Sequence, residues 1–217
     1  MLKPLEDLLL QLLNFFNQYV HNYGIAIILL TITVRILLLP LTIKQTRSLQ
    51  AMQKIQPKLK KLQEKYKDDK EKLQKEMMKF YAENKVNPLS GCLPLLLQLP
   101  IFFALFRMLL GNKALQKASF LVIPSLSKSA GDFSLAASQA IPYDLLIILM
   151  VATTYYSQKM ITTDPQQARM MVPMTLLMAF IAWRLPAGIL IYWVTTNIWT
   201  IVQQYVTLRA QPKTTTS

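Results

Sequence analysis

The sequence predicts an all-α membrane protein with five transmembrane helices, an N-terminal interfacial helix and a cytoplasmic helical hairpin. The chain has 217 residues and is 53% hydrophobic, yet it carries a formal net charge of +13. The two properties are separated along the chain, because most lysines fall between Lys44 and Lys85 and the apolar runs lie on either side. This pattern indicates membrane spans joined by one large basic loop.

The first twenty residues predict an amphipathic helix at the membrane interface. Leucines and aromatic residues recur there at spacings of three and four, from Leu5 to Tyr19. A signal peptide is less compatible with this stretch, because its positive region is Lys3 alone and acids follow at Glu6 and Asp7.

Five apolar runs are the predicted spans. The second run follows Asn87, a candidate N-cap, and Pro88 at the first helical position. The third and fourth runs are short, which favours either core helices of a soluble protein or, as we prefer, spans in a locally thinned bilayer. In order, the runs are Tyr23–Leu41, Leu89–Leu110, Tyr143–Gln158, Met170–Trp183 and Ala187–Leu208.

The whole chain divides accordingly into ten segments. They are an external interfacial helix (1–20), the first span (21–43), the cytoplasmic hairpin (44–86), the second span (87–110), an external loop (111–142), the third span (143–159), a cytoplasmic loop (160–169), the fourth span (170–184), the fifth span (185–208) and a cytoplasmic tail (209–217).

The distribution of basic residues predicts the orientation. Seventeen Lys and Arg residues, thirteen of them in the loop from Lys44 to Lys85, fall on one side of a five-span topology, and six fall on the other. Cytoplasmic loops carry the excess of Lys and Arg. We therefore expect the N-terminus outside and the C-terminus in the cytoplasm of a bacterial plasma (inner) membrane.

The basic loop itself predicts two antiparallel helices. Apolar residues recur at helical spacing on both sides of Asp68 and Asp69, and Asp68 with Glu71 resembles a capping box. The lysines have two alternative explanations that composition does not separate: they enforce topology, or they bind phosphates such as those of ribosomal RNA.

Arg35 is the candidate functional residue, because it lies inside the first apolar run. On an unbroken helix it lies about 13 Å from Lys44 along the axis, which is deep for a charge to reach water. The first, second, fourth and fifth runs hold no acid. We therefore expect Arg35 to face a hydrated cavity, with a structural anchor to backbone carbonyls as the alternative.

Other polar residues of the spans could line the same cavity. For each of them ordinary hydrogen bonding between helices is the alternative, and for the aromatic pair an interfacial position is the alternative. The candidates are Thr31, Gln98, Gln158, Tyr192, Trp193 and Asn197.

Several stretches, in order and nearly along the whole chain, resemble the YidC family of membrane protein insertases. They are TITVRILLLPLTIKQ, QPKLKKLQEKY, EMMKFYAENKVNPLSGCLPLLLQLPIFFALF, SQKM and LPAGILIYWVTTN. The resemblance implies five spans around a hydrophilic groove that is open to the cytoplasm and lipid and closed outward. It also implies that Arg35 and Gln158 are groove residues and that Thr31, Tyr192 and Trp193 contact clients.

The predicted function is therefore the insertion of nascent membrane proteins by a non-enzymatic insertase and chaperone that acts as a monomer. Expected partners are client proteins and lipid, with the ribosome, the signal recognition machinery and the Sec translocon as further candidates. No cofactor or metal is expected, because the chain has one cysteine and one histidine and no phosphate-binding glycine loop. The alternative is a small-solute carrier or channel that uses Arg35 as an anion site; an intramembrane protease would need a paired acid or a histidine partner.

Overall fold

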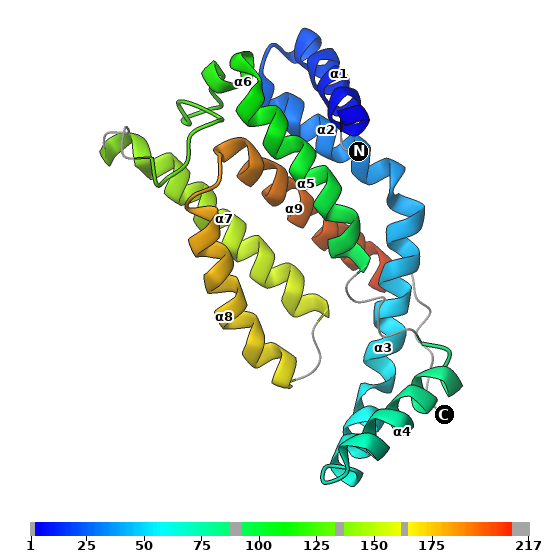
Figure 1. Cartoon of the computed structure of the whole chain (residues 1–217). Helices are drawn as coiled ribbons and strands as arrows, with labels where there is room; N and C mark the ends of the chain where they lie inside the picture. The colour runs from blue at the N-terminus through cyan, green and yellow to red at the C-terminus, as the bar shows by residue number, and fades with distance from the viewer. Residues whose placement is uncertain (1–2, 87–92, 133–136, 162–164, 210–217) are drawn as a thin grey trace.

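The computed structural model describes residues 3–86, 93–132, 137–161 and 165–209, and this part of the chain is all-helical (Figure 1). The helices are α1 (Lys3–Val20), α2 (Tyr23–Leu37), α3 (Leu39–Lys65), α4 (Lys70–Glu83), α5 (Leu93–Gly111), α6 (Lys113–Lys117), α7 (Ala137–Ile161), α8 (Pro165–Ala182) and α9 (Ala187–Arg209).

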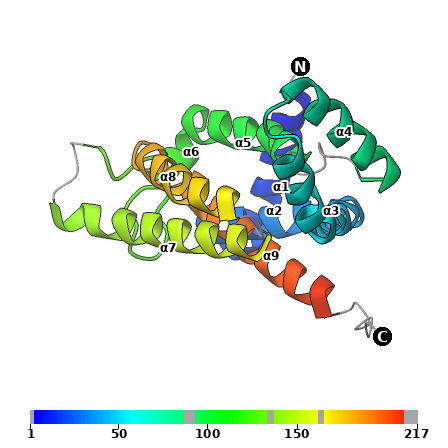
Figure 2. The same ribbon diagram turned by 90° about the horizontal axis from the view of Figure 1, so that it is seen from below.

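Helix α9 lies at the centre of the bundle. It packs most extensively against α7 and α2, while α1 packs on α2 and α5, and α8 packs on α7 (Figures 1 and 2). The main core joins α1, α2, α5 and α9 through side chains such as Leu13, Ile27, Leu105 and Ile189. A smaller core between α7, α8 and α9 contains Met150, Ala182, Leu190 and Val194.

A sharp bend separates α2 from α3. The two axes meet at 68°, and Leu38 lies between the helices. Pro40 stands in the first turn of α3, where proline is tolerated because its missing N–H has no helical partner. The expectation of an unbroken first helix through Lys44 is therefore wrong, and the depth estimated for Arg35 on such a helix does not hold.

The hairpin of α3 and α4 extends away from the bundle (Figure 1). Its first helix begins at Leu39, before the expected boundary at 43/44. The second helix is capped by Asp69, whose side chain accepts a hydrogen bond of 3.0 Å from the N–H of Lys72. The cap predicted at Asp68 is therefore wrong by one residue. No described residue of α4 is fully buried, so this helix adds little to the core.

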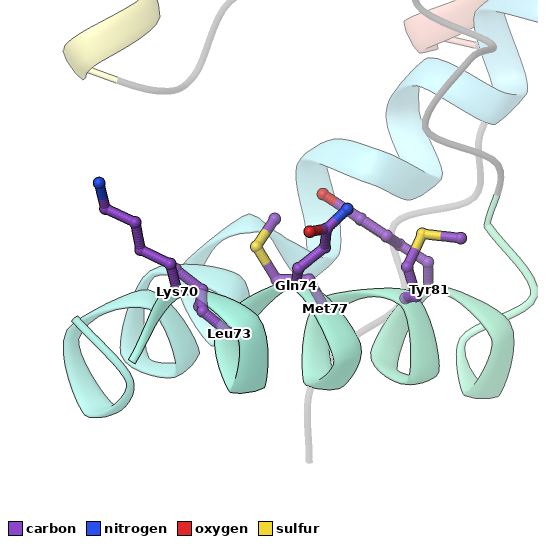
Figure 3. Close-up of a pocket in the computed structure, with 6 residues that line it drawn as sticks. Lys70, Leu73, Gln74, Met77 and Tyr81 are labelled. Carbon is purple, nitrogen blue, oxygen red and sulfur yellow. The ribbon is translucent and has the colours of Figure 1, made fainter. Parts of the chain in front are cut away.

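An open pocket of about 200 Å³ lies on α4 (Figure 3). Its wall is largely apolar, and the methionine Met78 is 62% exposed. Partial burial raises the pKa of the Tyr81 hydroxyl in this wall. The lining residues are Lys70, Leu73, Gln74, Met77, Met78 and Tyr81.

Helix α7 has 25 residues and is longer than the run Tyr143–Gln158 that predicted a short helix. Among the described residues, Ser138–Met160 is the one helix that is long and apolar enough by itself to cross a membrane. The bent pair α2 and α3 passes the same test together, and Gln98–Gly111 and Met171–Ala182 are shorter apolar helices. The helix start predicted at Asn87 and Pro88 lies outside the described residues.

Candidate functional site

Side chains from three helices meet at Arg35. Its Nη2 donates a hydrogen bond of 3.1 Å to Oε1 of Gln98 on α5, and Nε2 of Gln98 donates to the hydroxyl of Tyr192 on α9. A guanidinium can only donate, so Gln98 must turn its oxygen to Arg35 and its NH₂ group to Tyr192. The chain of bonds therefore fixes both the direction of the amide and the position of the charge.

The surroundings of these three hydrogen-bonded side chains are mostly apolar. Arg35 is half-buried, and Tyr192 is 3% exposed within the main core. Of the five N–H donors of the guanidinium, one is bonded to a described side chain, and no described carboxylate lies within ion-pair distance. A charge in this setting still needs partners, which water or a bound polar group can supply.

Thr31 lies one turn before Arg35 on the same helix. Its side chain is 2% exposed, and its hydroxyl donates to the carbonyl of Ile27 at 2.6 Å. The hydroxyl is therefore already bonded within α2, and the described contacts do not connect it with Arg35, Gln98 or Tyr192.

Asn197 and Trp193 serve the packing of α9 in this structure. The Asn197 amide donates to the hydroxyls of Thr154 at 2.8 Å and Thr153 at 3.2 Å on α7. Trp193 is half-buried, and its ring meets Phe102 edge to face with centroids 6.2 Å apart. Both positions therefore tie α9 to its neighbours within the bundle.

Gln158 lies near the C-terminal end of α7 and is half-buried. It follows Thr154 by four residues, so the two share a face of the helix, and Thr154 bonds to α9. Gln158 is therefore placed one turn beyond the Asn197 contact, while the described contacts of Arg35 do not include it.

A second polar cluster was missed by the sequence analysis. The Thr42 hydroxyl on α3 lies 3.2 Å from Oε1 and 3.0 Å from Nε2 of Gln203 on α9, and Trp199 Nε1 donates to the same Oε1 at 3.2 Å. The sequence does contain a pattern that indicates this cluster: Tyr192, Trp199 and Gln203 are seven and four residues apart and share one helical face.

The N-terminal end of α9 is joined by backbone hydrogen bonds to the loop after α6 (residues 118–132). The N–H of Ala187 donates to the carbonyl of Lys128, and that of Gly188 donates to the carbonyl of Leu126, each at 2.9 Å. Among the described residues, no group of three or more His, Cys, Asp or Glu side chains could hold a metal ion.

The sequence is similar to that of known proteins over nearly its whole length. Residues 15–214 match the model of the family described as 60Kd inner membrane protein. A protein of Caldanaerobacter subterraneus subsp. tengcongensis is 46% identical over 199 residues, which cover 92% of this chain and 91% of that protein. A protein of Nitratidesulfovibrio vulgaris is 41% identical over 209 residues, which cover 95% of this chain and 38% of that protein. Both are named membrane protein insertase YidC.

The fold is similar to a solved structure as well. A crystal structure of an active YidC insertase with its first transmembrane domain resolved matches with a TM-score of 0.71 and 33% sequence identity. The match covers 95% of this chain and 47% of that chain. This chain therefore spans nearly all of one relative and less than half of the second relative and of the solved chain.

Proposed function

The chain belongs to the family of YidC membrane protein insertases, and from this premise we propose that it inserts client proteins into the membrane through a hydrated recess at Arg35. The observation that carries the proposal is the half-buried guanidinium, held by Gln98 and Tyr192 from two other helices and lacking a described carboxylate partner. A charge kept inside apolar helices without an ion pair is typical of a functional intramembrane site.

The recess lowers the barrier for the polar part of a client. An acidic or polar tail leaves water, replaces water around the free donors of Arg35, and then crosses the remaining membrane. The apolar helix of the client passes along α2 and α9 into lipid. Its burial, at about 25 cal/mol per Å² of apolar area, supplies a driving force without nucleotide hydrolysis.

In this proposal five segments cross the membrane, namely α2, α5, α7, α8 and α9. Helix α1 lies on the outer surface, the hairpin of α3 and α4 lies in the cytoplasm, and the C-terminus is cytoplasmic. The thirteen basic residues from Lys44 to Lys85 support this orientation. The backbone bonds between the outer loop and the start of α9 support a recess that is closed outward.

Partners beyond the client follow from the same orientation. A basic hairpin in the cytoplasm would meet anionic surfaces, so the ribosome, the signal recognition machinery and the Sec translocon are candidate partners. Action as a monomer is part of the proposal. The alternative of a small-solute carrier or channel is disfavoured, because the relatives are named as insertases.

Replacing Arg35 with Ala tests the proposal. In reconstituted vesicles we expect Arg35→Ala to insert a client with an acidic translocated tail at least about tenfold more slowly, which corresponds to roughly 1.4 kcal/mol of lost attraction. Arg35→Lys should retain much of the activity, because it keeps the positive charge. Arg184→Ala is the matched control, since this exposed arginine stacks on Trp183 at 5.5 Å, away from the recess.

Two results would contradict the proposal. One is insertion by Arg35→Ala at the rate of the unmodified protein for acidic tails. The other is an equal loss for clients with acidic and neutral tails, which would indicate damage to the fold instead of a lost electrostatic contact.

A further inference from the structure

The contact between Thr42 and Gln203 joins two elements that otherwise diverge. Thr42 lies in the first turn of α3, just beyond the bend, and is 8% exposed. Helix α3 lies beside the end of α9 near this contact and then continues away from the bundle (Figure 1). The hydroxyl and the amide lie within 3.2 Å of each other, so this bond helps to hold the hairpin against α9.

The contact lies on the path between the hairpin and Arg35. Gln203 follows Tyr192 by eleven residues, which is about 16 Å along α9 and close to three full turns. The two side chains therefore lie on nearly the same face of α9. Thr42 follows Arg35 by seven residues across the bend. Thr42 and Gln203 therefore both lie closer to the hairpin than Arg35 and Tyr192 do.

An unsatisfied donor lies next to the contact. Gln45 follows Thr42 by three residues on α3 and is 4% exposed. Its Nε2 has no hydrogen-bond partner among the described residues. Leaving such a group buried without an acceptor costs about 1–3 kcal/mol. The cluster therefore has an uncharged donor that an incoming oxygen would satisfy.

We propose that the bond between Thr42 and Gln203 is a clasp that a client opens, after which Thr42, Gln45 and Gln203 bind peptide groups of that client. The inference rests on the proposed function, because the client is the ligand. A hydroxyl and a primary amide each donate and accept, as a peptide group does, so the exchange conserves hydrogen bonds. The buried amide of Gln45 gains an acceptor, and α3 is free to move at the bend.

The test measures the distance between a position on α3 and a position on α9. Spin labels are placed at two exposed positions, Lys58→Cys on α3 and Val206→Cys on α9, in a Cys92→Ser background. The distance distribution is recorded in vesicles with and without a ribosome-stalled client that carries an acidic tail. We expect the client to displace the main peak, and Thr42→Val to produce the same displacement without any client.

The control is Thr46→Val, one turn further along α3. The Thr46 hydroxyl donates to the carbonyl of Thr42 at 2.9 Å, within its own helix, so its loss should leave the peak in place. Gln203→Leu should also displace the peak, because it removes the same contact together with the acceptor of Trp199 Nε1. The double variant should displace the peak no further than Gln203→Leu alone, since the two changes share the Thr42–Gln203 contact.

The clasp is wrong if the client leaves the peak of the unmodified protein in place, or if Thr42→Val behaves like Thr46→Val. The same measurement in Arg35→Ala separates the two proposals. Displacement of the peak without insertion would support the clasp and the role of Arg35 together. Insertion at an unchanged rate would refute the role of Arg35, while the peak position still decides the clasp.

Discussion

Gln98 fixes the position of the Arg35 guanidinium. Its oxygen accepts from the guanidinium, and its NH₂ group is held by the Tyr192 hydroxyl, so rotation of the amide would break both bonds. A hydrogen bond to a charged group contributes roughly 1.5–3 kcal/mol. Gln98 thus holds Arg35 in position without neutralising its charge, which a carboxylate at the same place would do.

Gln98→Glu tests this role at the scale of a single residue. We expect the new carboxylate to pair with Arg35 and to slow the insertion of clients with acidic tails about tenfold, while thermal stability is retained because the pair is satisfied. Gln98→Leu should keep the charge available but let the guanidinium move, with a smaller loss of insertion. Both variants are compared with the unmodified protein by their rates of client insertion and by their thermal unfolding in detergent. A rate for Gln98→Glu equal to that of the unmodified protein would refute the positioning role.

At the scale of elements, a glycine lets α2 pack closely against the loop after α6. A Cβ atom at Gly24 would overlap the ring of Phe120, whereas a Cβ at Gly111, the last residue of α5, would meet nothing within 4 Å. Overpacking of this kind typically costs 1–3 kcal/mol. The absence of a side chain at Gly24 is therefore a condition for the loop after α6 to cover α2.

We expect Gly24→Ala to lower the melting temperature in detergent by several degrees, because the loop carrying Phe120 must move, with about 1–3 kcal/mol lost. Gly111→Ala is the matched control and should leave the melting temperature unchanged or slightly raised. Equal melting temperatures for the two variants would show that the Phe120 ring moves aside without a loss of stability.

The hairpin should be the element that opens most readily. None of the described residues of α4 is buried, and Leu59, which is 8% exposed, is the one buried hydrophobic side chain among the described residues of α3. Regions with few buried contacts unfold locally at low free energy. In hydrogen exchange we expect α4 to exchange much faster than α7 and α9. Protection of α4 equal to that of α9 would contradict this expectation.

The elements differ in how far the sequence could predict them. Helical spacing predicted the hairpin, and the apolar run from Ala187 predicted α9 to within one residue of its end. The bend at Leu38 was missed although Pro40 signals it, because the leucines around that proline hide the break in an apolar run. The hydrogen bonds from Arg35 to Gln98 and from Gln98 to Tyr192 depend on the packing of three helices, which no local pattern determines.

At the scale of the whole molecule the two ends of the bundle are built differently. The loop after α6 is joined by backbone bonds to the start of α9, whereas the other end carries the bend, the Thr42–Gln203 contact and the basic hairpin. In Figure 1, α1 and α6 lie at one end of the molecule and the hairpin lies at the other. A recess at Arg35 would therefore open toward the hairpin.

Thiol labelling from the two sides of the membrane tests this asymmetry. In a Cys92→Ser background, Arg35→Cys and Gln158→Cys should react with an impermeant reagent added from the cytoplasmic side and remain unlabelled from outside. Leu121→Cys in the outer loop, where Leu121 is 84% exposed, should show the opposite behaviour. Equal labelling of position 35 from both sides would favour a channel. No labelling of this position from either side would indicate that Arg35 has a structural role and is not reached by water.

The central position of α9 has a consequence for biosynthesis. Helix α7 packs most extensively on α9, and α2 packs on α9 as extensively as on α1. Among the helices that the structure describes, α9 is the last in the sequence, so it leaves the ribosome after the others. Until then α2 and α7 lack one of the two main surfaces against which they pack, and Gln98 lacks its Tyr192 partner. Chains truncated before Ala187 should therefore be degraded rapidly by membrane proteases, whereas chains that end just after Arg209 should survive.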